Sequence, residues 1–244
     1  MIPKIIHFCW FGQGEKPALA EKCIASWRKF FPDYEIKEWN EYNFDVKKTR
    51  YTSQAYAAKK YAFVSDYARF DILYRYGGIY FDTDVEVLRP FDDILAQGAF
   101  IGCEQDGSPE ADEITANPGL GIAAAPGLGI YKEILDYYET QSFLNANGTP
   151  NLTTVVTRVT EILKRHGLEN RPGIQTVDGI TVYPSDYFNP LDSTTGRLQK
   201  TANTHSIHWY SKSWLPKSTR LRCKITNTCR RAFGKNCFDW LKRT

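Results

Sequence analysis

The chain has 244 residues, of which 42% are hydrophobic and 14% aromatic, and its formal net charge is +3 at pH 7. This length and composition suit one large α/β domain and exclude a disordered chain. No window approaches the roughly 20 apolar residues of a membrane-spanning helix, and the first residues turn polar too soon for a signal peptide, so we expect a cytoplasmic protein.

The N-terminal segments alternate between strand and helix signals. Residues 2–8 are apolar and predict a first strand, which leads into a loop at 10–14. Pro17 is expected to open a helix that continues to about residue 30, and residues 34–39 predict a second strand. A strand, helix, strand order at this spacing predicts parallel strands joined by a crossover helix.

A long helical pattern follows at residues 52–76, and Gly77-Gly78 is expected to end it. Residues 79–81 predict a short strand that leads into Asp82-Thr83-Asp84. Small residues at 117–127 would let the backbone approach a ligand closely, and ordinary loops are the alternative. The remaining expected elements are an extended segment at 85–88, helices near 127–143 and 151–166, and strands near 180–183 and 205–208.

Charge is distributed unevenly along the chain. Residues 212–244 hold ten Lys or Arg and a single acid, Asp239, whereas the preceding part is net acidic. Basic, aromatic and aliphatic side chains together suit the interface of an anionic bilayer. We therefore divide the chain into a domain at 1–215 and a basic aromatic tail at 216–244. A packed C-terminal helix with solvated charges is the alternative, and no nucleic-acid partner is expected, because no recognition module accompanies the charge.

The strongest local signal is the pair of acids Asp82 and Asp84. Side chains at i and i+2 of a strand point the same way, so both carboxylates can face one side. Without a cation they would repel each other, and Mg²⁺ or Mn²⁺ would remove that repulsion and bind phosphate oxygens. Such an ion stabilises the charge that develops on a leaving diphosphate. A solvated acidic turn is the alternative.

A second polar group lies upstream in Ser65-Asp66-Tyr67-Ala68-Arg69. Asp66 and Arg69 are three residues apart on the predicted helix and share a face. Arg69 could contact phosphate or sugar hydroxyls, and Asp66 could accept hydrogen bonds from a hexose. A surface ion pair of little energetic value is the alternative.

Four segments in this order resemble the DXD-sugar-binding glycosyltransferases: residues 2–10, 65–69, 80–84 and 208–214. That family includes bacterial capsular-polysaccharide transferases and fungal initiating mannosyltransferases, and its motifs are similar to those of the large glucosylating bacterial toxins. The resemblance covers roughly residues 2–215. It implies a GT-A fold with a mainly parallel central sheet flanked by helices, and retaining transfer of a hexose from a nucleotide sugar, with a UDP-sugar as the expected donor.

The resemblance also implies a role for each matching residue. Trp10 is expected to stack on the base, and Tyr80 to lie beside the nucleoside. His208 is the expected third ligand of Mn²⁺ or Mg²⁺, because a neutral imidazole at the end of a strand suits that ion; His205 competes for this role. The expected catalytic residues are Asp82, Asp84 and Arg69, and the expected substrate contacts are Phe8, Trp10, Ser65, Asp66, Arg69, Tyr80, Asp82, Thr83, Asn117, Ser213 and Trp214.

The expected function is therefore a metal-dependent hexosyltransferase of capsule or surface-polysaccharide synthesis. It would act on a glycan acceptor, expected to be a lipid-linked oligosaccharide, at the inner face of the cell membrane, where the tail would bind anionic lipid. A protein-modifying glycosyltransferase and a non-catalytic sugar-nucleotide binder are the alternatives. The sequence leaves open whether a carboxylate nucleophile or the leaving diphosphate guides the reaction, and it favours none of the nearby acids Glu104, Asp106, Asp112 and Glu113.

Overall fold

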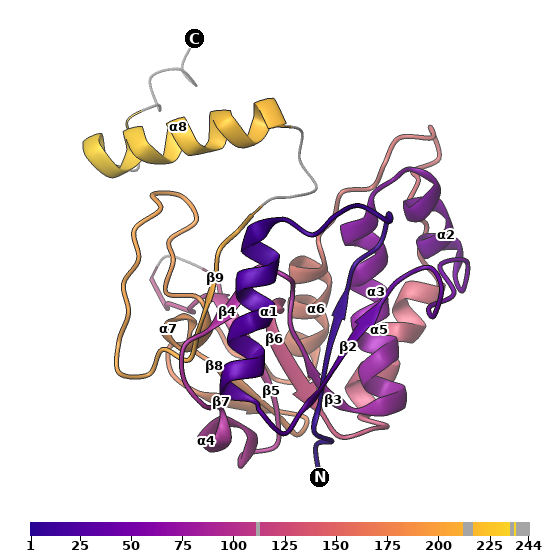
Figure 1. Cartoon of the computed structure of the whole chain (residues 1–244), viewed down its shortest axis with the longest axis horizontal. Coiled ribbons are helices and arrows are strands. Elements are labelled where there is room, and N and C mark those ends of the chain that lie inside the picture. The colour runs from indigo at the N-terminus through magenta and orange to yellow at the C-terminus, as the bar shows by residue number, and fades with distance from the viewer. Residues whose placement is uncertain (111–112, 212–216, 235–236, 238–244) are drawn as a thin grey trace.

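A computed structural model describes residues 1–110, 113–211, 217–234 and 237. A seven-stranded sheet with helices on both faces forms the centre of the molecule (Figure 1). In spatial order its strands are β2 (Glu35–Trp39), β1 (Ile5–Cys9), β3 (Gly78–Tyr80), β6 (Thr115–Ala124), β5 (Ala99–Gln105), β8 (Ile180–Tyr183) and β7 (Gln175–Val177). The expected α/β class is therefore confirmed.

Strand direction is mixed rather than mainly parallel, which corrects the expectation from the resemblance. β1 is parallel to both β2 and β3, and β5 is parallel to β8. The β3–β6, β5–β6 and β7–β8 pairs are antiparallel. Two of these three antiparallel pairs involve β6, which fills the centre of the sheet with residues that were expected to form a loop. Its backbone tolerates the crowded centre because it carries small residues: a Cβ on Gly121 would lie 2.7 Å from the Phe81 ring.

Two buried layers follow from the alternation of side chains along the strands. On one face, α2 (Arg50–Ala57), α3 (Tyr61–Tyr76), α5 (Gly129–Glu139) and α6 (Val155–Arg165) share a core with Tyr80 and Ile101. On the other face, α1 (Ala18–Phe30), α4 (Asp92–Leu95) and α7 (Ser185–Phe188) pack with Ile79 and Phe100. Neighbouring residues of one strand thus contribute to opposite cores.

The predicted helix at 52–76 is two helices. Thr49 caps α2 with a reciprocal capping box, and Lys59 adopts a left-handed φ of 58° between α2 and α3. At the far end, Gly77 and Gly78 have φ values of 64° and 100°. A Cβ on Gly78 would lie 2.6 Å from the Ile5 carbonyl oxygen, so glycine is required where the chain enters β3.

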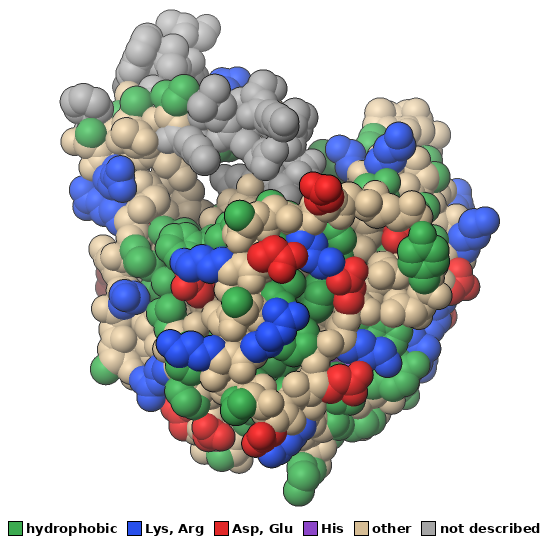
Figure 2. Space-filling view, in the orientation of Figure 1, with side chains coloured by type: hydrophobic (Ala, Val, Ile, Leu, Met, Phe, Trp, Pro, Cys, Tyr) green, Lys and Arg blue, Asp and Glu red, His purple; other side chains and the backbone are tan. Residues whose placement is uncertain are grey.

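A small second sheet completes the domain. β4 (Val85–Val87) pairs antiparallel with β9 (Ser206–His208), and Val85 lies opposite His208. This pairing brings the end of the domain back to the residues that follow β3. The predicted tail contains α8 (Lys217–Phe233), which lies apart from the central sheet (Figure 1). None of the described helices is both long and apolar enough to cross a membrane, and basic and acidic side chains intermingle on the face shown in Figure 2.

Candidate active site

A cavity of about 550 Å³ opens beyond the carboxyl ends of β1 and β3. Because these strands are parallel neighbours, the residues that follow them meet at one edge of the sheet. α3, the turn after β3 and the segment after β9 form its other walls. The predicted site residues that line it are Trp10, Ser65, Asp66, Arg69, Tyr80, Asp82, Thr83, Asp84, Asn117 and His208.

Phe8 is the exception among the described predicted residues. It is 4% exposed, and its ring packs 5.6 Å from that of Trp27 in the core beneath α1. Phe8 is on the opposite side of β1 from Cys9, which lines the cavity. The structure therefore makes Phe8 a core residue and not a substrate contact. Ser213 and Trp214 lie outside the described residues.

Arg69 lies at the centre of the polar wall. It is 3% exposed, and its Nη2 donates to Asp66 Oδ1 at 3.0 Å and to Asp82 Oδ1 at 3.2 Å. The Arg69 guanidinium also lies 5.0 Å from the centre of the Tyr80 ring. Burial raises the pKa of Asp66 to about 7, although Arg69 opposes the shift. This buried arrangement excludes the alternative of a surface ion pair.

Asp82 and Asp84 lie in the turn between β3 and β4, not within a strand. The turn is only partly solvated, because the side chain of Asp82 is 29% exposed and that of Asp84 is 13% exposed. Tyr80 donates its hydroxyl to Asp82 Oδ1 at 3.2 Å. Burial raises the pKa of Asp82. The positive charge of Arg69 opposes this shift, and the negative charge of Asp84 adds to it.

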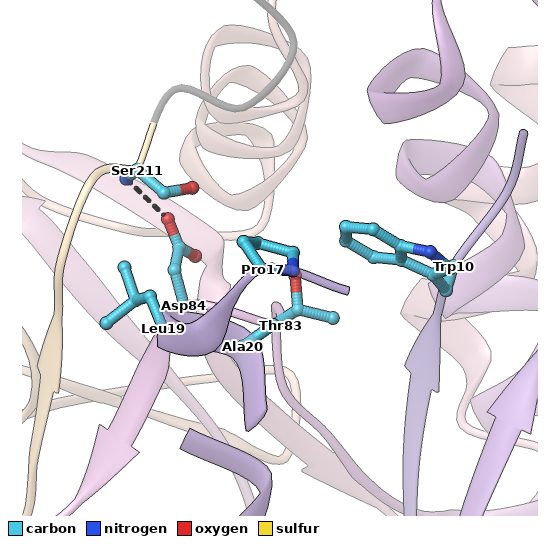
Figure 3. A pocket seen from close by; sticks show the side chains of 7 residues that line it. All are labelled: Trp10, Pro17, Leu19, Ala20, Thr83, Asp84 and Ser211. Carbon is cyan, nitrogen blue, oxygen red and sulfur yellow. Dashed lines mark hydrogen bonds between the residues drawn. The ribbon is translucent and has the colours of Figure 1, made fainter. Parts of the chain in front are cut away.

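His208 reaches Asp84 through the β4–β9 pairing. Its Nε2 lies 3.1 Å from Asp84 Oδ1, and the backbone N–H of Ser211 donates to Asp84 Oδ2 at 2.7 Å (Figure 3). Burial alone would raise the pKa of Asp84, but His208 and Ser211 lower it. Burial alone would lower the pKa of His208, but the Asp84 carboxylate outweighs burial and raises it. The rival His205 bonds Asp93 and is absent from the cavity wall as described.

The side chains fit a divalent cation in their chemistry. Two carboxylates and an imidazole line one cavity, and the buried Nδ1 of His208 has no hydrogen-bond partner among the described residues. In this structure the acids are engaged separately, Asp82 with Arg69 and Asp84 with His208. Accordingly, no group of three His, Cys, Asp or Glu side chains gathers as a ready-made metal site in the described ranges.

Trp10 lines this cavity and also a smaller pocket, where it lies across from Asp84 (Figure 3). Its Nε1 donates to the Gly14 carbonyl at 2.6 Å, which closes the loop 10–14. Tyr61 packs closely against this loop: a Cβ added to Gly12 would lie only 2.3 Å from the Tyr61 ring. The Trp10 indole is half-buried, so it can present a face to a ligand.

Several residues that line the cavity were not predicted from the sequence. Tyr61 lies one helical turn before Ser65, so the helical spacing could have revealed it. Tyr210 follows His208 with a φ of 48°, and its ring is edge-on to that of His208 at 4.3 Å. Another part of the wall, to which no sequence signal pointed, consists of Leu152, Thr154, Val155 and Val156.

Part of the chain is similar in sequence to known glycosyltransferases. Residues 17–101 match the family described as "Glycosyltransferase sugar-binding region containing DXD motif". Inositol phosphoceramide mannosyltransferases 3 and 1 of Schizosaccharomyces pombe are 32% and 29% identical to the chain over 111 residues. These matches cover 41% of this chain and 29% and 33% of the relatives, so the similarity spans about a third of their length.

Two solved glycosyltransferases are also similar to the chain. The structure titled PaToxG glycosyltransferase has a TM-score of 0.49 at 19% identity, covering 67% of this chain and 69% of that one. A glycosyltransferase involved in the glycosylation of the major capsid of PBCV-1 has a TM-score of 0.49 at 11% identity, covering 91% and 100%. Residues 17–101, which match the family of glycosyltransferase sugar-binding regions containing a DXD motif, are the segment that carries Arg69 and the Asp82–Asp84 pair.

Proposed function

We propose that this protein is a metal-dependent glycosyltransferase that takes a hexose from a nucleotide-sugar donor. The observation that carries the proposal is the convergence of the Asp82–Asp84 turn, Arg69 and His208 on one cavity at the carboxyl edge of β1 and β3. Ligands of open α/β sheets bind beyond the carboxyl ends of the strands. The cavity offers both an aromatic face and a charged wall, which a nucleotide sugar requires.

Each group has a distinct part in the proposal. The Trp10 indole stacks on the base, and Asp66 accepts hydrogen bonds from sugar hydroxyls. Asp66 and Asp82 hold Arg69 by hydrogen bonds, so its positive charge has a fixed position in the cavity wall. In the proposal, this charge faces the diphosphate. Asp82, Asp84 and His208 would hold Mn²⁺ or Mg²⁺, and that ion, when bound, supplies charge that stabilises the leaving diphosphate.

The donor is proposed from two sources. The resemblance favours a UDP-sugar, whereas the relatives with partial coverage are mannosyltransferases by name. We therefore include GDP-mannose among the candidate donors. Retention of the anomeric configuration, a lipid-linked acceptor and a role in surface-polysaccharide synthesis complete the proposal, with the tail at the inner face of the cell membrane.

Nucleotide release tests this function directly. The full chain is incubated with UDP-glucose, UDP-galactose or GDP-mannose, with Mn²⁺ or with excess chelator, and free UDP or GDP is measured. We expect release from at least one donor, dependent on Mn²⁺. Asp84→Asn should reduce it by about 10²-fold or more, because it removes a charge at the diphosphate while its amide oxygen still accepts from Ser211.

Asp136→Asn is the matched control, since Asp136 is an exposed carboxylate on α5 that pairs with Lys132. It should retain the activity of the parent chain. Full activity in excess chelator would overturn the metal role. Donor binding by calorimetry without release would instead support the non-catalytic binder.

A further inference from the structure

A hydrogen-bonded connection runs from β5 to the Asp82–Asp84 turn. Asn117 of β6 is 7% exposed, and its Nδ2 donates to Glu104 Oε2 of β5 at 2.8 Å. Its Oδ1 accepts from the backbone N–H of Gly119 at 2.7 Å. The Gly119 N–H can only donate, so the Asn117 oxygen faces Gly119 and the Asn117 amide nitrogen faces Glu104.

β6 bulges at this point. Ile101 of β5 lies opposite Ile122, while the next residue, Gly102, lies opposite Asn117, so residues 118–121 have no partners on β5. Pro118 has no N–H to donate within this segment. The Asn117–Gly119 hydrogen bond therefore holds the β6 backbone where its pairing with β5 is interrupted.

The bulge lies directly against Asp82. The Asp82 backbone N–H points to the Gly119 carbonyl at 3.4 Å. A Cβ on Gly119 would lie 2.3 Å from Asp82 Oδ2 and 3.0 Å from Asn117 Oδ1. The position of the bulge thus limits where the Asp82 carboxylate can lie.

Glu104 differs from the other acids near the end of β5. Asp106 accepts from the backbone N–H and the hydroxyl of Ser185, so it holds α7. Glu113 is exposed and pairs with Lys164. Glu104 is half-buried and is not part of the cavity wall as described, whereas its partner Asn117 is. The bond to Asn117 is therefore what links Glu104 to the bulge beneath Asp82.

We propose that Glu104 and Asn117 are positioning residues that hold the β6 bulge and thereby fix the Asp82 carboxylate for binding of the metal–diphosphate. The inference rests on the proposed function. It assigns Glu104 a role other than that of a nucleophile, because its carboxylate bonds Asn117 and is not part of the cavity wall as described. Loss of the Glu104 acceptor frees the Asn117 amide to rotate, and the bulge beneath Asp82 then shifts.

Two substitutions separate this role from general stability. Glu104→Gln keeps an acceptor oxygen for Asn117 Nδ2, while Glu104→Leu removes it at similar volume. We expect Glu104→Leu to lower kcat/KM for nucleotide release by about 10²-fold, since a displacement of about 1 Å at a reacting centre has that effect. Mn²⁺ affinity of the UDP complex, measured by calorimetry, should fall about tenfold or more. Glu104→Gln should restore both.

Asp106→Asn is the matched control, because it alters a carboxylate with two hydrogen bonds near the end of the same strand, directed to α7. It should leave Mn²⁺ affinity unchanged. A lower melting temperature of Glu104→Leu with unchanged Mn²⁺ affinity would overturn the inference. So would failure of both Glu104→Leu and Glu104→Ala to fold, since Glu104 would then be purely structural. If the parent chain releases no nucleotide, the proposed function fails, while the calorimetric comparison still tests the positioning.

Discussion

At the residue scale, Gly119 offers the sharpest test of the site. An added Cβ would meet Asp82 Oδ2 at 2.3 Å, and that oxygen is the end of a side chain and can move. We therefore expect Gly119→Ala to fold, to displace the Asp82 carboxylate, and to lower kcat/KM for donor hydrolysis by about 10²-fold. The measurements are nucleotide release and the melting temperature.

Gly129→Ala is the control for that substitution. Gly129 begins α5, no atom lies within 4 Å of its added Cβ, and its φ lies outside the left-handed region. Alanine there should keep full activity and raise stability by up to about 1 kcal/mol, because it reduces the freedom of the unfolded chain. Equal activity in the two variants would contradict the role assigned to Gly119.

Trp10 carries the second prediction at this scale. Stacking of an aromatic side chain on a base contributes about 1–3 kcal/mol, so Trp10→Ala should weaken UDP affinity roughly tenfold or more. Trp10→Phe keeps an aromatic face but loses the hydrogen bond to Gly14, and it should retain most of the affinity. Calorimetric titration with UDP measures both. Unchanged binding by Trp10→Ala would make the indole a loop-closing residue only.

Periodicity and spacing located the site residues that are close together along the chain, whereas the distant Trp10 and His208 came from the resemblance. Asp66 and Arg69 share a helical face, and Asp82 and Asp84 share one turn. Glu104 was considered but given no role, because its partner Asn117 is 13 residues away across an antiparallel pair, and only the strand register brings them together. Phe8 was misassigned because its motif also contains Trp10, while alternation along β1 turns Phe8 toward α1.

At the scale of elements, small residues predicted a loop where the structure has a strand. Gly and Pro within 115–124 favoured a loop, yet this segment is the longest strand of the central sheet. It is covered on both faces: Ala116 lies in one core, and Leu120 lies in the other. A strand packed from both sides takes small residues, and tertiary packing here overrides their weak strand propensity. The left-handed Lys59 that divides α2 from α3 also had no sequence signal.

The element that carries the next prediction is α8. Among its described contacts with the domain, Asn227 Nδ2 donates to the Ser193 carbonyl at 2.9 Å, and Arg197 donates to the Arg231 carbonyl at 3.0 Å. Ile225 is 57% exposed. Exposed apolar and basic side chains on one helix suit an anionic membrane surface, where each basic residue contributes about 1 kcal/mol.

Removal of residues after 216 should release the protein from anionic vesicles and leave hydrolysis of the soluble donor unchanged. Co-sedimentation with phosphatidylserine-containing vesicles at low salt measures the first effect, and nucleotide release measures the second. Neutral vesicles and high salt are the controls, because screening weakens the attraction. Equal sedimentation of the full and shortened chains would mean that the tail does not bind the membrane.

At the scale of the whole molecule, His7 joins three parts of the fold. It is 0% exposed, its Nδ1 accepts from Trp39 Nε1 at 3.0 Å, and its Nε2 donates to the Gly77 carbonyl at 2.9 Å. β1, β2 and the turn between α3 and β3 are thereby linked through one neutral ring. A second ring proton would face the Trp39 N–H, so the fold requires the neutral form. Burial, aided by the Lys37 charge, lowers the pKa of His7 to about 4 against the effect of Gly77.

The sign of the resulting pH dependence follows from linkage. Below about pH 6.5 the unfolded chain takes up a proton at His7 that the folded chain does not accept until about pH 4, so this contribution to stability is lost as pH falls. The loss should reach roughly 3 kcal/mol at about pH 4. Asp66, with its pKa raised to about 7 by burial, has the opposite slope, so the parent chain alone would show little net change from the two groups.

The difference between the parent chain and His7→Gln isolates the contribution of His7, because the other titrating groups are common to both. Above about pH 7 the parent should be more stable by about 1–3 kcal/mol, since glutamine cannot make both hydrogen bonds with the same geometry. As pH falls toward 4, this advantage should shrink by roughly 3 kcal/mol and can reverse. Urea unfolding of both chains at a series of pH values measures it. A difference that stays constant from pH 8 to about pH 4 would show that His7 titrates alike in the folded and unfolded chains, contrary to the burial and hydrogen bonding seen here.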